Sequence, residues 1–258
     1  RTPADIDFIV LGTTSADMQF PSTANFVSHK LGCGRIGSVD VWAACTGSIY
    51  SLSVGAQYVQ TGKYRRVLTI GAEALSRITD WTDRSTCVLL ADAAGAAVLE
   101  ASDDGSGLID ADLYSDAQHA ELLYMPAGGA RTPASHETVD ARLHYVKMKG
   151  SELFKIAVRM FVESATTILE RHGLKARDVD LFIPHQANLR IIEAAAKRVD
   201  LPMERVFVNI DRYGNTGAAS IYVALEEAVA SGRLKRGDLV LLAAFGGGVT
   251  WGAALIRW

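Results

Sequence analysis

An internal repeat limits the folds that are open to this chain. The stretch DIDFIV, residues 5–10, resembles DVDLFI, residues 178–183, at an offset of 173 residues. The longer stretch CTGSIYSLSVGAQYVQTGKYRRVLTIG, residues 45–71, resembles NTGAASIYVALEEAVASGRLKRGDLVLL, residues 215–242, at an offset of 170 residues. Because the spacing between the paired stretches is nearly kept, the sequence predicts two halves of similar topology.

Apolar runs alternate with helical patterns in both halves. Runs such as DFIVLG, RVLTIGAE and LVLLAAF are typical of strands buried on both faces, whereas SIYSLSVGAQYVQTG and ASIYVALEEAVASG are typical of helices. This alternation predicts an α/β fold, and 258 residues, 49% of them hydrophobic, suffice for a large core. We expect a first half at residues 1–105, a connecting segment at 106–147 and a second half at 148–258.

The two halves differ at their beginnings. A long amphipathic helix is predicted at residues 151–173, before DVDLFI, whereas only the four residues RTPA precede DIDFIV. We therefore expect the first half to lack an opening strand and helix, and we interpret the sequence as part of a longer chain. Its first sheet would then have an unpaired edge, which predicts that this chain by itself is unstable or prone to aggregate.

Composition and charge disfavour several broad classes of protein. A net charge of −3 gives no support for general nucleic-acid binding. The three cysteines lack the density and spacing of a disulfide scaffold, which favours a reducing cytoplasm. The uncharged residues 239–256 are nearly numerous enough to span a membrane, but three consecutive glycines disfavour a helix. We expect no membrane span here, but two buried antiparallel strands around a turn.

The segment VWAACTGSIY places Cys45 between an apolar run and a predicted helix start. An isolated cysteine is most often a buried structural thiol. A helix start also offers free N–H groups and a partial positive charge, which stabilise a thiolate and lower its pKa below about 8.5. The same N–H groups are suited to an oxyanion on a thioester carbonyl. The sequence leaves both interpretations open, and the second predicts a lowered pKa for Cys45.

Three further motifs carry polar or flexible groups. In FIPHQANLR, His185 follows a strand pattern, so it either makes a local hydrogen bond or faces a ligand at the strand's carboxyl end. In RYGNTGAAS, Asn215 either caps the next helix or donates its amide N–H to a substrate. The glycines of AFGGGVTWG allow close approach of a ligand and offer N–H groups for an oxyanion. No zinc, P-loop or serine-hydrolase motif is present, so we expect no metal site.

Taken in order, AACTG with Cys45, PHQAN with His185, GNT with Asn215 and AFGGGVTWG resemble the β-ketoacyl-acyl carrier protein synthase III family. The resemblance runs along the whole chain, without the family's usual N-terminal segment of roughly 65 residues. It implies a thiolase-like fold, in which two pseudo-symmetric βαβαβ halves form a five-layered αβαβα sandwich. It also implies a cytoplasmic homodimer.

The same resemblance implies a reaction. Cys45 would take an acyl group, with acetyl as the expected primer, from acyl-CoA, and malonyl-acyl carrier protein would then lose CO2 and attack the thioester. His185 and Asn215 would stabilise the enolate, and the N–H groups of Cys45 and Gly247 would hold the acyl oxyanion. The resemblance implies no cofactor, because acyl-CoA and malonyl-acyl carrier protein are substrates.

The resemblance also carries over residues that bind substrates and partners. Phe20 would wall the partner subunit's acyl pocket, and Arg84 would stack on the adenine of CoA. The remaining substrate-binding residues would be Asn188, Phe245 and Gly246. The residues expected to dock acyl carrier protein are Arg190, Lys155, Lys197 and Arg198. LLADAAGA, at residues 89–96, departs from the family's usual Phe-Gly-Asp-Gly-Ala-Gly-Ala and leaves primer preference open.

Other functions remain alternatives. A related acyltransferase or ketosynthase of secondary metabolism shares the fold, and so does a non-catalytic fragment that acts as a dimer partner. The latter would have lost Cys45, His185 or Asn215, which are all present. A type III polyketide synthase fits PHQAN and GNTGAAS less well. A hydroxymethylglutaryl-CoA synthase would need a general-base glutamate, for which Glu73 is the nearest candidate in sequence.

Overall fold

Two mixed four-stranded sheets form the frame of the protein, whose computed structural model describes all residues from 1 to 258. In the first sheet β1 pairs parallel with β2 and β3, and β4 pairs antiparallel with β3. In the second sheet β8 pairs parallel with β9, and β10 pairs antiparallel with β9 and β5. The first sheet has the order β2 (Gly37–Val41), β1 (Phe8–Gly12), β3 (Arg66–Ala74) and β4 (Asp92–Glu100); the second has the order β5 (Gly107–Ser115), β10 (Thr250–Arg257), β9 (Leu239–Gly246) and β8 (Leu181–Pro184).

The predicted repeat is visible in the topology. β1, β3 and β4 of the first half have the same order and directions as β8, β9 and β10 of the second, and a parallel bridge from Phe182 to Val206 stands in the place of β2. β5 flanks β10, whereas β4 has no strand on its outer side. The first half of this chain therefore has no counterpart of β5, as the sequence predicted. β5 also lies in the predicted connecting segment, residues 106–147, so this segment contributes a strand to the second sheet.

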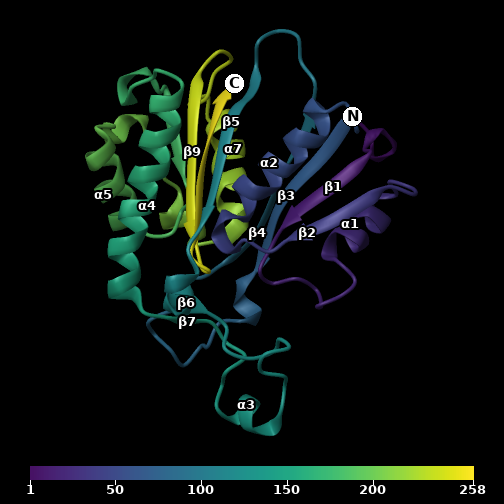
Figure 1. Cartoon of the computed structure of the whole chain (residues 1–258), viewed down its shortest axis with the longest axis vertical. Helices are drawn as coiled ribbons and strands as arrows, with labels where there is room; N and C mark the ends of the chain where they lie inside the picture. Colours follow the sequence, from purple (N-terminus) through teal and green to yellow (C-terminus); the bar gives the residue numbers. More distant parts are fainter.

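Five layers of secondary structure are stacked side by side in Figure 1. α2 and α7 lie between the two sheets, α1 covers the outer face of the first sheet, and α4 and α5 cover the outer face of the second. These helices are α1 (Thr23–Leu31), α2 (Gly47–Gln60), α4 (Gly150–Arg171), α5 (Leu189–Val199) and α7 (Ser220–Ala230). The αβαβα sandwich of two similar halves is therefore confirmed.

Short elements connect the layers. They comprise helices α3 (His136–Asp140) and α6 (Ile210–Tyr213), strands β6 (Leu123–Tyr124) and β7 (Lys147–Met148), and the 3₁₀ turns η1 (Pro3–Asp5), η2 (Ala44–Thr46), η3 (Leu75–Arg77), η4 (Ala117–Leu122), η5 (Ala176–Asp178), η6 (Met203–Arg205) and η7 (Gly217–Ala219). β6 and β7 form a small antiparallel sheet. The segment with α3 projects from the body of the molecule in Figure 1.

Two large apolar clusters stabilise the second half. One lies between α4, α5 and the second sheet and includes Phe161, Ile192 and Leu241. The other lies between the central helices and the opposite face of that sheet and includes Ile49 and Ile221. Both helices α2 and α7 are covered on two sides, which agrees with their apolar and small side chains. The largest gain in free energy on folding therefore comes from burial around β9 and β10, whose inner residues are fully apolar.

The two antiparallel strands predicted within residues 239–256 are confirmed. They are β9 and β10, paired with Phe245 opposite Trp251, and the glycine turn joins them. The apolar run is explained by this burial in the sheet. None of the helices combines the length and hydrophobicity that crossing a membrane would require.

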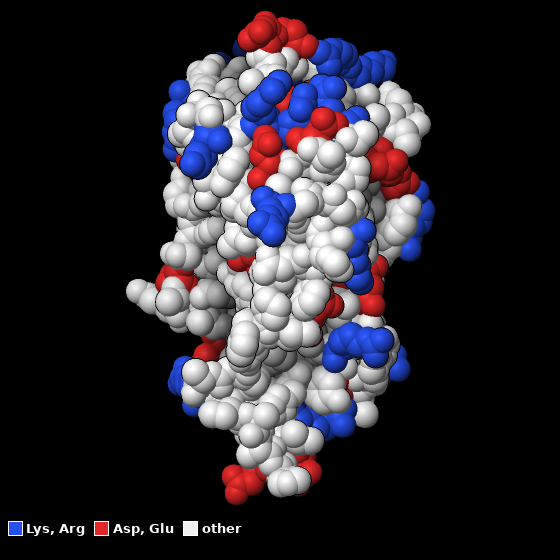
Figure 2. All heavy atoms as spheres, turned by 90° about the vertical axis from the view of Figure 1, so that its right-hand side faces the viewer, with Lys and Arg blue, Asp and Glu red and all other residues white.

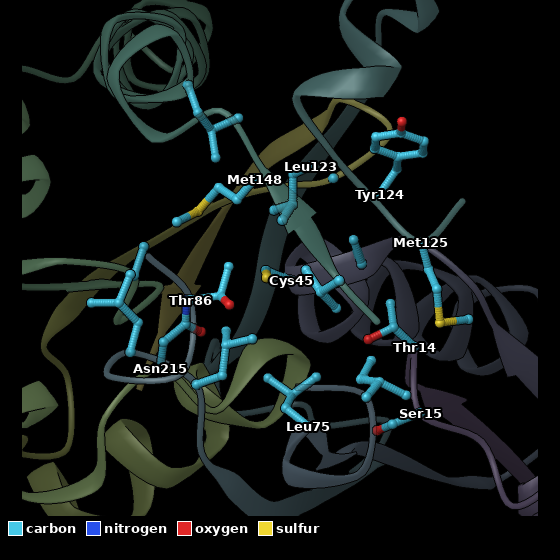
Figure 3. Close-up of a pocket in the computed structure, with 18 of the residues that line it drawn as sticks. Thr14, Ser15, Cys45, Leu75, Thr86, Leu123, Tyr124, Met125, Met148 and Asn215 are labelled. Carbon is cyan, nitrogen blue, oxygen red and sulfur yellow. The ribbon is translucent and has the colours of Figure 1, made fainter. Parts of the chain in front are cut away.

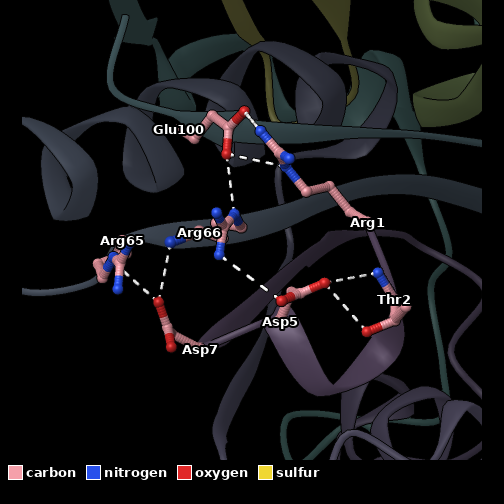
Figure 4. A network of polar contacts seen from close by, with 7 residues as sticks. All are labelled: Arg1, Thr2, Asp5, Asp7, Arg65, Arg66 and Glu100. Carbon is pink, nitrogen blue, oxygen red and sulfur yellow. Dashed lines mark hydrogen bonds and ion pairs between the residues drawn. The ribbon is translucent and has the colours of Figure 1, made fainter.

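Exposed ion pairs attach the start of the chain to the first sheet (Figure 4). Nε of Arg66 lies 2.8 Å from Glu100, and Arg1 pairs with the same carboxylate. Asp7 accepts hydrogen bonds from the backbone N–H groups of Arg65 and Arg66. The two guanidinium groups bring the pKa of Glu100 down to about 2. Because these pairs are accessible to solvent, they orient the segment more than they stabilise the fold.

Closely packed glycines join the two halves at the centre of the molecule. A Cβ added at Gly71 would lie well within 3.0 Å of the Ala218 backbone, a separation that real Cβ atoms essentially never show. A Cβ added at Gly12 would meet the backbone of Gly47 in the same way, and one at Gly47 would lie 2.9 Å from Cβ of Ala218. Backbone atoms cannot move aside as flexible side chains do. These glycines are therefore needed for the approach of η7 and α2 to the first sheet.

We expect Gly71→Ala to lower the free energy of unfolding by about 1–3 kcal/mol, the usual cost of overpacking a core. Urea unfolding followed by circular dichroism measures this change. Gly150→Ala is the matched control, because the nearest atom to its added Cβ is Cε of Met148 at an ordinary 3.7 Å. Equal stability of the two variants would contradict the close contact.

Candidate active site

Cys45 lies in the 3₁₀ turn η2, which runs directly into α2. The residue before it, Ala44, has a left-handed φ of 48°, a conformation that costs a non-glycine residue free energy. This turn redirects the chain from β2 into the central helix layer. The sequence prediction that Cys45 lies at a helix start is therefore confirmed, and the local backbone strain is concentrated beside it.

The glycines of AFGGGVTWG bring the end of β9 against Cys45. A Cβ added at Gly246 would lie 2.6 Å from the backbone nitrogen of Cys45 and 3.2 Å from its Cα. A Cβ added at Gly247 would lie 2.6 Å from the carbonyl oxygen of Leu123. Only glycine fits at these two positions. The two backbones therefore lie close enough for N–H groups from both segments to border one site.

The Cys45 thiol has a different pKa from the one that the sequence predicted. Its pKa is raised to about 12, mainly by burial and also by the nearby Glu73 carboxylate, although a hydrogen bond from the backbone at Cys45 acts in the opposite direction. The expectation of a lowered pKa is wrong, because desolvation of the thiolate outweighs the helix start. Cys45 is thus a neutral thiol in the resting protein.

His185 lies at the carboxyl end of β8, where its backbone N–H donates to Ala243 of β9. The ring is only 1% exposed, and Nδ1 lies 2.6 Å from Oγ of Ser220. Burial lowers the pKa of His185 to about 3, so the imidazole is neutral near pH 7. Both sequence interpretations hold together here: the histidine makes a local hydrogen bond, and its ring also lines a cavity.

Asn215 is fixed by its backbone and by its side-chain oxygen. Its N–H donates to Leu89, and its carbonyl accepts from Ala91. Its Oδ1 accepts a hydrogen bond from the N–H of Gly217, the first residue of the turn η7, at 2.9 Å. Asn215 does not cap the helix α7, whose N-cap residue is Ala219. Because the hydrogen bond from Gly217 occupies Oδ1, the donor Nδ2 is available for a hydrogen bond to a ligand in the cavity that Asn215 lines.

One cavity brings these groups together. It has a volume of about 1110 Å³, most of its lining residues are hydrophobic, and Cys45, His185 and Asn215 all line it. Figure 3 shows the side chains of Cys45 and Asn215 directed into this space, with Leu123 and Met148 on another side. The other predicted residues that line it are Lys155, Asn188, Arg190, Phe245 and Gly247. A thiol, an imidazole, a side-chain amide and a largely apolar space thus share one site.

Five predicted binding residues are not among those that line this cavity. One of them, Gly246, packs against the backbone of Cys45. Arg84 is exposed on the loop before β4, and Lys197 and Arg198 are exposed on the last turn of α5. Phe20 is 83% exposed, in the loop that precedes α1. No set of three or more His, Cys, Asp or Glu side chains is arranged to hold a metal ion.

Much of the cavity wall comes from residues that the sequence did not indicate. Leu123, Met125 and Met148 belong to or adjoin β6 and β7, and Thr14 and Ser15 follow β1. None of them forms a recognisable motif. The only available signal was the position of Thr14 and Ser15 directly after a strand, where ligands bind in α/β sheets.

Glu73 is held in a network of hydrogen bonds. Its carboxylate accepts from the backbone N–H of Thr14, from the hydroxyl of Ser15 at 2.5 Å and from the backbone N–H of Ala218. Burial raises its pKa, and these donors partly offset that effect. The carboxylate therefore joins the β1 loop to η7, and its oxygens are committed to this anchoring rather than free for general-base chemistry.

Comparison with known proteins identifies the family. The model of 3-oxoacyl-[acyl-carrier-protein (ACP)] synthase III matches residues 39–117, and the model of its C-terminal part matches residues 169–258. The β-ketoacyl-[acyl-carrier-protein] synthase III of Caldanaerobacter subterraneus subsp. tengcongensis is 49% identical over 256 residues, which cover 99% of this chain and 77% of that protein. This chain belongs to the 3-oxoacyl-[acyl-carrier-protein] synthase III family.

The similarity to synthase III proteins extends to solved structures. The crystal structure of 3-oxoacyl-[acyl-carrier-protein] synthase III from Aquifex aeolicus VF5 matches with a TM-score of 0.91 and 46% identity, over 100% of this chain and 79% of that one. The β-ketoacyl-[acyl-carrier-protein] synthase III of Solibacter usitatus is 51% identical over 257 residues, which cover 98% of this chain and 78% of that protein. The predicted family and fold class are therefore confirmed.

The low pKa of His185 predicts a pH-dependent stability. At about pH 4.5 the folded ring stays neutral, whereas in the unfolded chain, with a pKa near 6.5, it is protonated. The unfolded state then binds more protons, so this group lowers the free energy of unfolding as pH falls from about 6.5 towards 3.

We therefore expect the free energy of unfolding to fall more between about pH 7 and pH 4.5 in the wild type than in His185→Gln, which has no titrating ring. Urea unfolding at both pH values measures the two differences. The other acidic groups cancel in this comparison. An equal fall in the two proteins would show that His185 is not held neutral by the fold.

Proposed function

We propose that this chain carries out the decarboxylative condensation of an acyl-CoA primer with malonyl-acyl carrier protein, which gives 3-ketoacyl-acyl carrier protein and initiates fatty-acid synthesis. The observation that carries the proposal is the convergence of Cys45, His185 and Asn215 on one largely apolar cavity. The names of the relatives that match the chain support the same reaction. We propose no cofactor, because a thiol nucleophile and hydrogen-bond donors suffice for both stages.

In the first stage the Cys45 sulfur attacks the thioester carbonyl of acyl-CoA. The new S–C bond forms on Cys45, the bond to the CoA sulfur breaks, and the thiol proton ends on CoA. Because the pKa of Cys45 is about 12, the thiol is neutral near pH 7, and its proton leaves as the sulfur attacks the carbonyl. The backbone N–H groups of Cys45 and Gly247 stabilise the oxyanion of this step.

In the second stage the malonyl thioester loses CO2. The C–C bond to the carboxylate breaks, and the electron pair forms an enolate whose oxygen accepts hydrogen bonds from His185 and Asn215. The enolate carbon then attacks the acyl carbonyl on Cys45, and the thiolate leaves and regains a proton. Neutral donors suit this step, because they stabilise the developing negative charge without protonating the carbon nucleophile.

Positive charge around the cavity supports acyl carrier protein as a partner. Arg190 and Lys155 line the cavity, and the guanidinium of Arg190 lies 5.7 Å from the ring centre of Phe154. Lys197 and Arg198 add two exposed cations on the same helix as Arg190. Such groups steer an acidic partner towards the site more than they fix its affinity. Asn188, at the start of α5, and Arg84 on its loop are our candidates for contacts to CoA.

We also propose a cytoplasmic homodimer. Large apolar side chains are exposed on and around β2 and α1, among them Phe20, Leu31, Val39 and Trp42. Figure 2 shows that the middle of this side of the molecule carries few charged groups. A partner covering this side would bury them, and Phe20 would reach towards the partner's cavity. The three free cysteines suit a reducing compartment.

Intact mass measurement before and after incubation with acyl-CoA esters of increasing chain length tests the first stage. We expect the mass of the chain to rise by one acyl group, and the increment to be absent in Cys45→Ala. Cys33→Ala is the matched control, because Cys33 is a buried thiol that does not line the cavity, and this variant should be acylated normally. An increment retained in Cys45→Ala would contradict the assigned nucleophile.

The two stages should respond differently to loss of the histidine. We expect His185→Ala to be acylated at nearly the wild-type rate, but to release 14CO2 from labelled malonyl-acyl carrier protein about 100-fold more slowly, the usual effect of removing one oxyanion donor. Rapid-quench acylation and CO2 release on the same protein measure the two rates. An equal loss in both stages, with the fold intact, would contradict the division of roles.

A further inference from the structure

Ser220 forms a direct contact behind the imidazole of His185. It is the first residue of α7 and only 2% exposed, and its Oγ lies 2.6 Å from Nδ1 of His185. The backbone N–H of Gln186 donates to the same oxygen at 3.3 Å. The hydroxyl therefore joins the loop that follows β8 to the helix that follows Asn215.

The hydrogen bonding of this serine differs from that of Ser164 and Ser51, two other buried serines in helices. The hydroxyl of Ser164 donates to the carbonyl of Met160 at 2.9 Å, and that of Ser51 donates to the carbonyl of Ser48 at 3.0 Å. Ser220 makes no hydrogen bond to a carbonyl. The only acceptor that the structure offers to its proton is Nδ1 of His185.

This arrangement selects one tautomer of the imidazole. If Nδ1 carried the ring proton, it would donate to Ser220, and the serine proton would be buried without an acceptor, which is unfavourable. If Nδ1 accepts from Ser220 instead, both groups are satisfied, and the ring proton lies on Nε2. Nε2 makes no hydrogen bond within the protein, and it belongs to the ring edge opposite Ser220. It is not among the fully buried unpartnered atoms, and His185 lines the cavity.

We propose that Ser220 is a positioning residue for the condensing step, and that its hydroxyl holds His185 in the tautomer that presents an Nε2–H donor to the malonyl thioester oxygen. This inference rests on the proposed function for its kinetic consequence, but the tautomer itself does not. Ser220 touches neither substrate nor reacting atoms. It acts through His185, as orienting partners of functional histidines do.

Gln186 holds His185 in a fixed position relative to Ser220. Its side-chain amide donates to the carbonyls of Pro184 and Phe207 at 2.8 and 3.2 Å, and its Oε1 accepts from the N–H of Asn209 at 3.0 Å. These hydrogen bonds fix the backbone around His185, and Gln186 itself is only 1% exposed. The distance from Nδ1 to Ser220 is therefore set by the fold rather than by a mobile loop.

The test combines Ser220→Ala with two independent measurements. We expect acylation of Cys45 to stay within about twofold of wild type. We expect the kcat for CO2 release from malonyl-acyl carrier protein to fall about 10- to 100-fold, the range known for loss of the orienting partner of a metal-bound histidine. In 15N NMR of histidine-labelled protein, we expect protonated Nε2 and bare Nδ1 in the wild type, and a mixture of tautomers in Ser220→Ala. Ser220→Thr, which keeps the hydroxyl, should restore both readouts.

Ser164→Ala is the matched control, because it removes a buried helical hydroxyl that does not touch His185, and it should change neither readout. Unchanged CO2 release in folded Ser220→Ala, or a wild-type spectrum with the proton on Nδ1, would overturn the proposal. If Ser220→Ala does not fold, the wild-type spectrum alone decides the tautomer. A wild-type protein with protonated Nε2 but without acylation would instead contradict the proposed function and leave the positioning of the ring supported.

Discussion

The contact between two tight turns at the centre of the sandwich is the constraint on which the site depends. η2 leads from Cys45 into α2, and η7 leads from Asn215 into α7. The turns pack so closely that a Cβ at Gly47 would collide with Ala218. This approach brings residues 170 positions apart in sequence to one cavity. The repeat therefore shapes the site, because two copies of one strand-turn-helix unit bring the Cys45 thiol and the Asn215 amide to the same cavity.

Burial controls the electrostatics of the cavity. It raises the pKa of Cys45 to about 12 and lowers that of His185 to about 3, so the resting site holds a neutral thiol and a neutral ring. Separated charges would have to be desolvated before any substrate was bound. A site of neutral donors avoids this desolvation cost, and its donors stabilise negative charge when the reaction produces it. The hydrogen bond from Ser220 agrees with this, because a hydroxyl orients the imidazole of His185 and leaves it neutral.

The supporting elements come from segments that carry no recognisable motif. Glu73 ties the loop after β1 to η7 through buried hydrogen bonds, and β6 and β7 bring Leu123 and Met148 to the cavity. The asymmetry between the halves has a similar basis. β5 covers the outer edge of β10, while the outer edge of β4 has no strand beside it. The repeated units therefore share a backbone plan, but the surroundings of each unit differ.

The sequence by itself determined the α/β class, the repeat, the strands within residues 239–256 and the three residues at the centre of the site. These features depend on local periodicity, glycine turns and short motifs, which a linear pattern records. Only the tertiary structure decided the pKa of Cys45, the hydrogen bonds of Glu73 to backbone and hydroxyl donors, and the partner of His185. Each depends on desolvation or on contacts between segments distant in the chain, such as Ser220 with His185. A helix start alone would lower the pKa of Cys45, but burial raises it, and the sequence does not show how deeply a residue is buried.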